Sequence, residues 1–194
     1  MWGTRLEREL PVLADRQDVF RETIAPLPRL FIFGGGDDAR PLVKMANDTG
    51  WQVTVVDSRH AYATKSRFPD ADVVVASADE IALRVHLDDR AFVAVMTHRY
   101  AEDKKLLGTL LSRPLAYLGI LGPRKRTERL LAELRGEGTI FHPCVQESLY
   151  SPIGLDLGGS TPEVVALSIL AEMHGRLSNR LPVNLRHRPG SIHG

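Results

Sequence analysis

The sequence is poor in cysteine, in charge of one sign and in long apolar runs. One cysteine among 194 residues, Cys144, excludes an internal disulfide framework and suits a reducing cytosol. A formal net charge of +1 gives no reason to expect nucleic acid or a membrane surface as the main partner. No apolar run approaches the ~18 residues of a membrane span, and the first ten residues lack the apolar core of a signal peptide. These absences indicate a cytoplasmic globular protein.

A second absence concerns metals. The seven histidines show no metal-ligand spacing with carboxylates or with the thiol, so we expect no metal site. For Cys144, which follows His142 and Pro143, a sulfur-carrying or metal-binding role is the less favoured interpretation.

Three segments differ in composition. Residues 1–28 are charged and end in Pro26-Leu27-Pro28, and we interpret them as a short N-terminal extension. Residues 29–179 alternate apolar runs with helical patterns, whereas 180–194 has no apolar period and is expected to be a loose tail. Runs that are apolar throughout are typical of strands buried on both faces of a parallel sheet. The pattern predicts a doubly wound, mainly parallel α/β domain of the Rossmann type. The expected strands are 30–33, 53–57, 73–75, 92–96 and 116–120.

A glycine turn follows the first expected strand. Gly34, Gly35 and Gly36 lead into Ala39 as G-x-G-x-x-A, the fingerprint of a nucleotide-binding βαβ unit. Asp57 ends the next strand about 20 residues on, where a carboxylate accepts hydrogen bonds from ribose hydroxyls. Arg59 would instead meet a ribose 2′-phosphate, which leaves NAD against NADP open. The alternative is that small residues here only bring helix and strand together.

Two acidic residues qualify this motif. Asp37 and Asp38 complement a helix dipole but occupy or repel the space of an anionic pyrophosphate. With Asp38 as the N-cap, Pro41 becomes the third helical residue, where its missing N–H does no harm. This acidic cap weakens the phosphate cradle and makes less charged adenosine ligands, such as S-adenosylmethionine, competitive.

Two further clusters follow later strands. Thr97 and His98 lie at the end of 92–96, where ligands bind in parallel sheets, although a histidine there can equally bond to backbone. After 116–120, Gly122 precedes Arg124, Lys125 and Arg126 at a helix start. Cations at a helix N-terminus interact unfavourably with the helix dipole, and an anionic ligand would offset this repulsion. The alternative is a solvated charged turn.

A glycine-rich loop precedes the last helix. Ser160 and Glu163 have capping-box spacing, while Thr161 with Pro162 offers an alternative cap. For the glycines of this loop, packing against a neighbour is favoured over contact with a ligand.

Six stretches between about Arg29 and Leu177 belong together: Phe33–Ala39, Val55–Arg59, Arg67–Pro69, Met96–His98, Leu118–Arg126 and Ser151–Asp156. Taken in order, they resemble the XdhC/CoxI family of accessory factors for molybdenum hydroxylases such as xanthine dehydrogenase and carbon monoxide dehydrogenase. The resemblance implies a Rossmann-like C-terminal domain that handles molybdenum cofactor. Family members commonly carry an N-terminal domain with a cysteine linked to cofactor handling. Residues 1–28 would be its last remnant, and Cys144 lies outside the matching stretches.

The resemblance favours a maturation factor that acts by binding rather than turnover. It would hold molybdenum cofactor or a nucleotide, assist sulfuration, and deliver the cofactor to an apo-enzyme together with a cysteine desulfurase; a homo-oligomer is compatible with this interpretation. The alternative is an NAD(P)-dependent oxidoreductase, and a methyltransferase is weaker. No catalytic residue is assigned. The ligand-contact candidates are Gly34, Gly35, Gly36, Asp57, Arg59, Thr97, His98, Gly122, Arg124, Lys125 and Arg126.

Overall fold

The computed structural model describes residues 7–9, 19–21 and 26–187. Its centre is a sheet of parallel strands in the order β5-β4-β3-β6-β7-β8. The strands are β3 (Arg29–Phe33), β4 (Gln52–Asp57), β5 (Asp72–Val75), β6 (Ala91–Val95), β7 (Tyr117–Ile120) and β8 (Leu149–Tyr150). The chain builds outward from β3 to β5, then returns and builds from β6 to β8 on the other side. The predicted doubly wound α/β fold is therefore confirmed, and the strand order reverses between β3 and β6.

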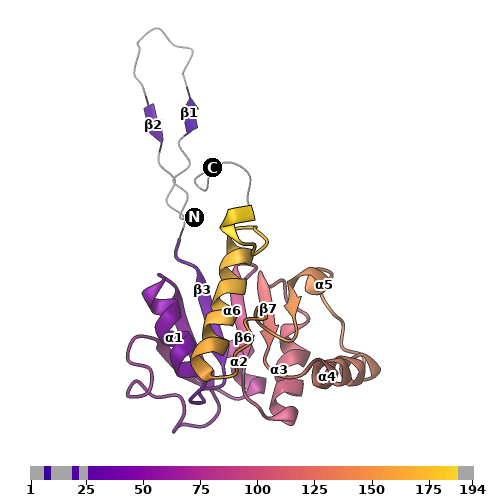
Figure 1. Cartoon of the computed structure of the whole chain (residues 1–194). Helices are drawn as coiled ribbons and strands as arrows, with labels where there is room; N and C mark the ends of the chain where they lie inside the picture. The colour runs from indigo at the N-terminus through magenta and orange to yellow at the C-terminus, as the bar shows by residue number, and fades with distance from the viewer. Residues whose placement is uncertain (1–6, 10–18, 22–25, 188–194) are drawn as a thin grey trace.

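Helices cover both faces of the sheet (Figure 1). On one face lie α1 (Ala39–Asp48) and α6 (Pro162–Leu177), which pack against each other. On the other lie α2 (Ile81–Arg84), α3 (Tyr100–Leu110) and α4 (Arg124–Gly136). The short α5 (Val145–Ser148) precedes β8, and the 3₁₀ turns are η1 (Ala78–Glu80) and η2 (Leu185–His187).

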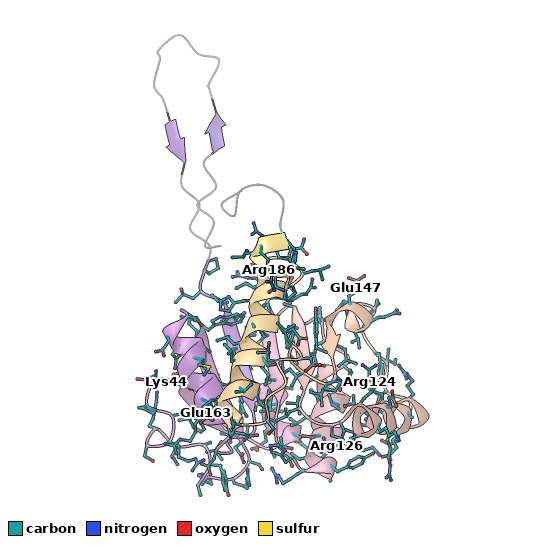
Figure 2. The ribbon with its side chains drawn as sticks, in the orientation of Figure 1. Lys44, Arg124, Arg126, Glu147, Glu163 and Arg186 are labelled. Carbon is teal, nitrogen blue, oxygen red and sulfur yellow. The ribbon has the colours of Figure 1, made fainter. Side chains whose placement is uncertain are left out.

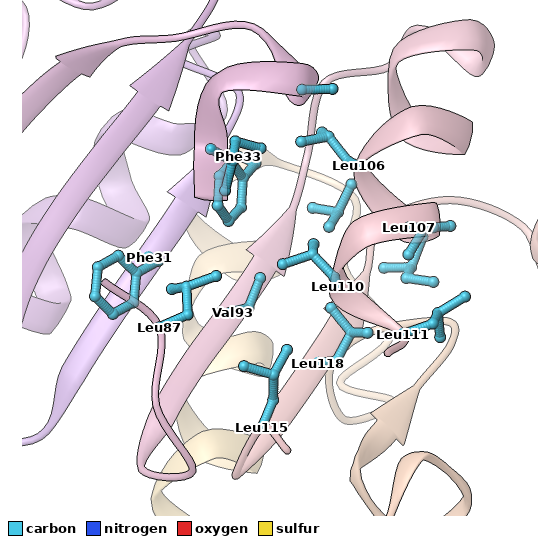
Figure 3. Packing of buried hydrophobic residues seen from close by; sticks show 14 of the residues in the cluster. Phe31, Phe33, Leu87, Val93, Leu106, Leu107, Leu110, Leu111, Leu115 and Leu118 are labelled. Carbon is cyan, nitrogen blue, oxygen red and sulfur yellow. The ribbon is translucent and has the colours of Figure 1, made fainter. Parts of the chain in front are cut away.

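Alternation along each strand divides the core into two clusters. Phe31 and Phe33 point to the side of α3, while Leu30 and Ile32 point to α1 and α6. Figure 3 shows Phe31 and Phe33 with the leucines of α3, which include Leu106 and Leu110. Each such side chain, fully buried, contributes about 1.5–3 kcal/mol from removal of apolar surface from water. Both faces of the sheet are therefore buried, and the loops extend from the ends of its strands.

The predicted elements compare closely with those in the structure. The five expected strands are present with boundaries shifted by one residue, and the predicted apolar face of α1 is buried. Strand β8 was not predicted, because its two residues follow a stretch without a period. Within the segment expected as an extension, β1 (Glu7–Glu9) pairs antiparallel with β2 (Val19–Arg21). The turn η2 falls in the expected tail, whose residues 188–194 lie outside the described part of the chain.

The link between β4 and β5 shapes the site. Residues 58–71 contain no helix, only turns, and they carry Arg59, Tyr62 and Arg67 back toward the glycine turn after β3. In the ranges that the structure describes, no helix is long and apolar enough to cross a membrane.

Candidate functional site

The carboxyl ends of the parallel strands meet at one edge of the sheet, at the bottom of Figure 1. Four of the loops at this edge hold or border the predicted site residues: 34–38 after β3, 58–71 after β4, 96–99 after β6 and 121–123 after β7. In open α/β sheets ligands bind outside the carboxyl ends of the strands where the strand order reverses, which here is between β3 and β6. By this rule we call the surface formed by the four loops the crevice. All the predicted site residues lie on these loops or at their borders.

The glycine turn is tightly packed on two sides. Gly34 has φ +118°, and a Cβ atom there would lie 2.5 Å from the backbone oxygen of Met96. A Cβ on Gly35 would collide with the backbone oxygen of Tyr62, and Arg67 donates a hydrogen bond of 3.1 Å to the Gly35 carbonyl. Packing therefore requires glycine at both positions, although the close neighbours are the end of β6 and the loop after β4 rather than the helix that the alternative interpretation named. Nucleotide binding at this turn stays a prediction.

Asp57 ends β4 and is buried, with 1% of its side chain exposed. Its Oδ1 accepts hydrogen bonds from the backbone N–H and Nε of Arg59, each 2.9 Å. Its Oδ2 accepts from Arg59 Nη2 at 2.8 Å and from the Gly35 N–H at 2.9 Å. Burial alone would raise the pKa of Asp57, but the hydrogen bonds from Arg59 and Gly35 outweigh it and hold the pKa below its ordinary value. The carboxylate is thus ionised and fully bonded.

The two acidic residues of the turn pair with basic residues of neighbouring loops. Asp38 is the N-cap of α1 and Pro41 its third residue, so the predicted acidic cap is confirmed, although the Asp38 side chain makes no capping hydrogen bond. Instead, its Oδ2 lies 2.5 Å from His98 Nε2, while Asp37 accepts a 2.8 Å bond from Arg67. These contacts join the loops after β3, β4 and β6.

His98 lies at the point where the strand order reverses. Its ring is 61% exposed, and its backbone has φ +57°, a left-handed conformation that is uncommon outside glycine. Such backbone strain clusters at functional sites. Position, exposure and backbone together keep His98 as a ligand-contact candidate.

Beside it, a buried polar network joins α3 to α4. Thr97 donates to Asp103, in the first turn of α3, and accepts a 3.1 Å bond from the Arg99 N–H. Arg126 Nη2 lies 2.6 Å from the other oxygen of Asp103, a charge contact rather than an aligned hydrogen bond. The network holds the loop after β6 against the first turn of α4.

The basic cluster of α4 is divided by this network. Arg126 turns inward to Asp103, with 20% of its side chain exposed, whereas Arg124 and Lys125 are exposed. Figure 2 shows Arg124 and Arg126 at the start of α4. Gly122, with φ +128°, makes the turn before them. The Asp103 carboxylate pairs with Arg126, whereas Arg124 and Lys125 are exposed, and anion binding by these two residues stays a prediction.

Sequence reasoning named no role for several residues of the crevice. Arg67 was noted only within a family-like stretch, and Asp103 has the sequence context of an ordinary acidic residue in a first helical turn. Arg99 donates a 3.1 Å hydrogen bond to Ser58, and Tyr62 lies under the Arg59 guanidinium at 3.6 Å. Neither contact is predictable from the sequence, because Arg99, Ser58 and Tyr62 do not belong to a motif that pairs them.

Two further predictions, for the N-cap of the last helix and for Cys144, concern residues outside the crevice. Thr161 is the N-cap of α6 with Pro162 as its first residue, so the second of the two caps is the one used. The Cys144 sulfur lies 2.9 Å from His142 Nδ1, away from the crevice before α5, and its role stays open. Among residues 26–187, no three His, Cys, Asp or Glu side chains gather as a metal set.

Comparisons with known proteins agree on the fold. The model of the XdhC Rossmann domain matches residues 30–173. A Bacillus subtilis protein, named as a probable xanthine dehydrogenase subunit, is 40% identical over 167 residues, covering 84% of this chain and 47% of that protein. The uncharacterized protein YqeB of Escherichia coli is 28% identical over 169 residues, covering 86% of this chain and 30% of that one.

A solved structure agrees as well. A crystal structure described as a xanthine dehydrogenase from Bacillus halodurans superposes with a TM-score of 0.72 at 34% identity, covering 86% of this chain and 46% of that one. The chain therefore spans less than half the length of each of these relatives. The family match runs from β3 through most of α6, and the chain belongs to the XdhC family by its Rossmann domain.

Proposed function

We propose that this protein is an accessory factor of a xanthine dehydrogenase-type molybdenum hydroxylase. In this role its crevice holds molybdenum cofactor or a nucleotide-type ligand while the cofactor is sulfurated and inserted into the apo-enzyme. A cysteine desulfurase would supply the sulfur, and the site would act by binding. Support comes from the relatives, whose names place them with xanthine dehydrogenase, and from the crevice chemistry.

The observation that carries the proposal is the exposed pair Arg124 and Lys125 at the start of α4. Both lie in the first turn of a 13-residue helix, beside the loop after β7. Helix N-termini and cations both favour phosphate, and Arg124 offers a planar set of donors. The residues therefore fit a ligand that carries a phosphate group, as the pterin cofactor does. Arg126 stays paired with Asp103 and positions the turn.

The crevice offers little to a hydride-transfer enzyme. A dehydrogenase needs an acid–base group next to the transferred hydride, and His98 is the residue best placed for it. Its Nε2 is engaged by Asp38, which ties the loops after β3 and β6; the same pairing would also orient a catalytic histidine. We favour binding because the relatives associate the chain with xanthine dehydrogenase, and NAD(P) enters as a candidate ligand.

A deletion of the gene in its native host tests the function. Xanthine dehydrogenase made without the protein should keep its polypeptide level but lose most of its specific activity and cyanide-labile sulfur. Return of the wild-type gene should restore both. Equal specific activity with and without the protein would refute the proposal.

Charge reversal then links the function to the crevice. The variant R124E/K125E should fail to restore activity, because it repels the phosphate. The matched control R90E/R113E makes the same change in net charge in the turns before β6 and β7, at the opposite edge of the sheet, and should restore activity fully.

A further inference from the structure

Arg59 decides what the crevice accepts at the end of β4. A carboxylate offers about four acceptor positions. Four donors already fill those of Asp57: the N–H, Nε and Nη2 of Arg59, and the N–H of Gly35. A ribose diol that donates two hydrogen bonds to this carboxylate thus finds no free position while Arg59 stays in place.

The guanidinium plane of Arg59 also stacks on an aromatic ring. Its guanidinium carbon lies 3.6 Å from the centroid of the Tyr62 ring, and Arg67 lies over the same ring at 5.2 Å. A bidentate ion pair and a stacked aromatic ring fix the orientation of the guanidinium. The side chain nevertheless keeps 37% of its surface exposed, so it can meet a ligand from the crevice side.

A second guanidinium reaches the same short segment. Arg99, from the loop after β6, donates to the Ser58 hydroxyl, and its buried Nε has no hydrogen-bond partner within the described residues. The guanidinium groups of Arg59 and Arg99 therefore both lie close to Ser58. Glu102 lies 3.8 Å from Arg99. Guanidinium groups beside a hydroxyl are groups that bind phosphate.

We infer that Arg59 is the specificity residue of this crevice: it excludes an unmodified ribose diol and, with Arg99 and Ser58, selects a nucleotide whose ribose carries a phosphate. The inference rests on the proposed function and concerns its nucleotide-type ligand, the alternative to molybdenum cofactor itself: it narrows that nucleotide to one class, the ribose-phosphorylated adenosine nucleotides. It also chooses between the NAD and NADP interpretations that the sequence leaves open.

Calorimetric titration of the purified protein tests this with three small probes that differ only at the ribose. These are 5′-AMP, 2′,5′-ADP and 3′,5′-ADP. We expect 2′,5′-ADP to bind at least about tenfold more tightly than 5′-AMP, which corresponds to about 1.4 kcal/mol. The 3′-phosphate probe shows whether the pocket selects the 2′ position or any phosphate on the ribose.

Variants then assign the effect. R59A should lose the preference for phosphate and bind 5′-AMP more tightly than wild type does, because Asp57 becomes free to accept the diol. R59A combined with D57N should lose that gain. The control R90A removes an exposed arginine at the opposite edge of the sheet and should leave all affinities unchanged.

Three results would overturn the inference: equal affinity of wild type for 5′-AMP and 2′,5′-ADP, an unchanged ratio in R59A, or no binding of any probe by both proteins. A circular dichroism spectrum and a urea midpoint near wild type confirm that R59A is folded. These titrations need no molybdoenzyme, so their failure is distinct from failure of the accessory role.

Discussion

Replacement of Gly34 by alanine measures how far packing dictates the glycine turn. The new Cβ would lie 2.5 Å from the Met96 carbonyl oxygen and 2.9 Å from the Thr97 nitrogen, both backbone atoms of the neighbouring strand end. The position also has φ +118°, which a residue with a Cβ rarely adopts. Backbone strain costs about 1–3 kcal/mol and overpacking about 1–3 kcal/mol. We therefore expect G34A to lower the free energy of unfolding by about 2–6 kcal/mol.

Urea unfolding followed by circular dichroism measures this change, with two matched controls. Gly138 has φ +82° but no atom within 4 Å of its Cβ position, so G138A should cost only the strain of its backbone, about 1 kcal/mol. Gly136 lies at the end of α4 with ordinary φ and open space, and G136A should be neutral or slightly stabilising. Equal costs for G34A and G138A would refute the packing argument.

Further predictions concern the crevice and the core. D103N should lower the free energy of unfolding, measured in urea, by about 3 kcal/mol, because it leaves Arg126 without its carboxylate. The double variant D103N/R126M should recover part of this loss. No recovery would show that the ion pair is unimportant for stability. The folded-state pKa of Asp57 lies below the unfolded value of about 3.9, so its stabilisation is present above that pH and is lost as pH falls through the folded pKa. Unfolding free energies at pH 5 and pH 3 should differ less in D57N/R59A than in wild type, and equal differences would contradict this. L110A should lower the free energy of unfolding by about 2–5 kcal/mol, because Leu110 is fully buried. L83A changes a side chain that is 90% exposed, and its free energy of unfolding should stay within about 0.5 kcal/mol of wild type in thermal or urea unfolding. A similar loss in both variants would argue against the core described here.

The fold was predictable because its signals are local. Strands such as Arg29–Phe33 are apolar almost throughout, and α1 has its apolar residues at helical spacing, so periodicity alone identifies them. The cap of α1 followed from the backbone chemistry of Pro41. Strand β8 has only two residues, and its place beside β7 depends on tertiary contacts that no period reveals.

The crevice was predictable only by position. That Asp57 and His98 end parallel strands follows from the alternation of elements, and the topology then brings them to one edge. Their partners were not predictable: Arg59 fills the acceptor positions of Asp57, and Asp38 meets His98 across 60 residues of chain. A motif states which residue types are present, whereas the loops of the folded chain decide whether their donors and acceptors are already used.

The central claim is that the crevice holds the cofactor of a molybdenum hydroxylase, and its direct test is the ligand content of the protein. The protein and its R124E/K125E variant would be purified from cells that make molybdenum cofactor, and bound molybdenum and pterin measured by mass spectrometry and fluorescence. The account predicts that wild type and R90E/R113E carry similar amounts of molybdenum and pterin per mole of protein, and that R124E/K125E has lost most of both. Wild-type protein that carries neither molybdenum nor pterin, or a variant that carries as much as wild type, would contradict it.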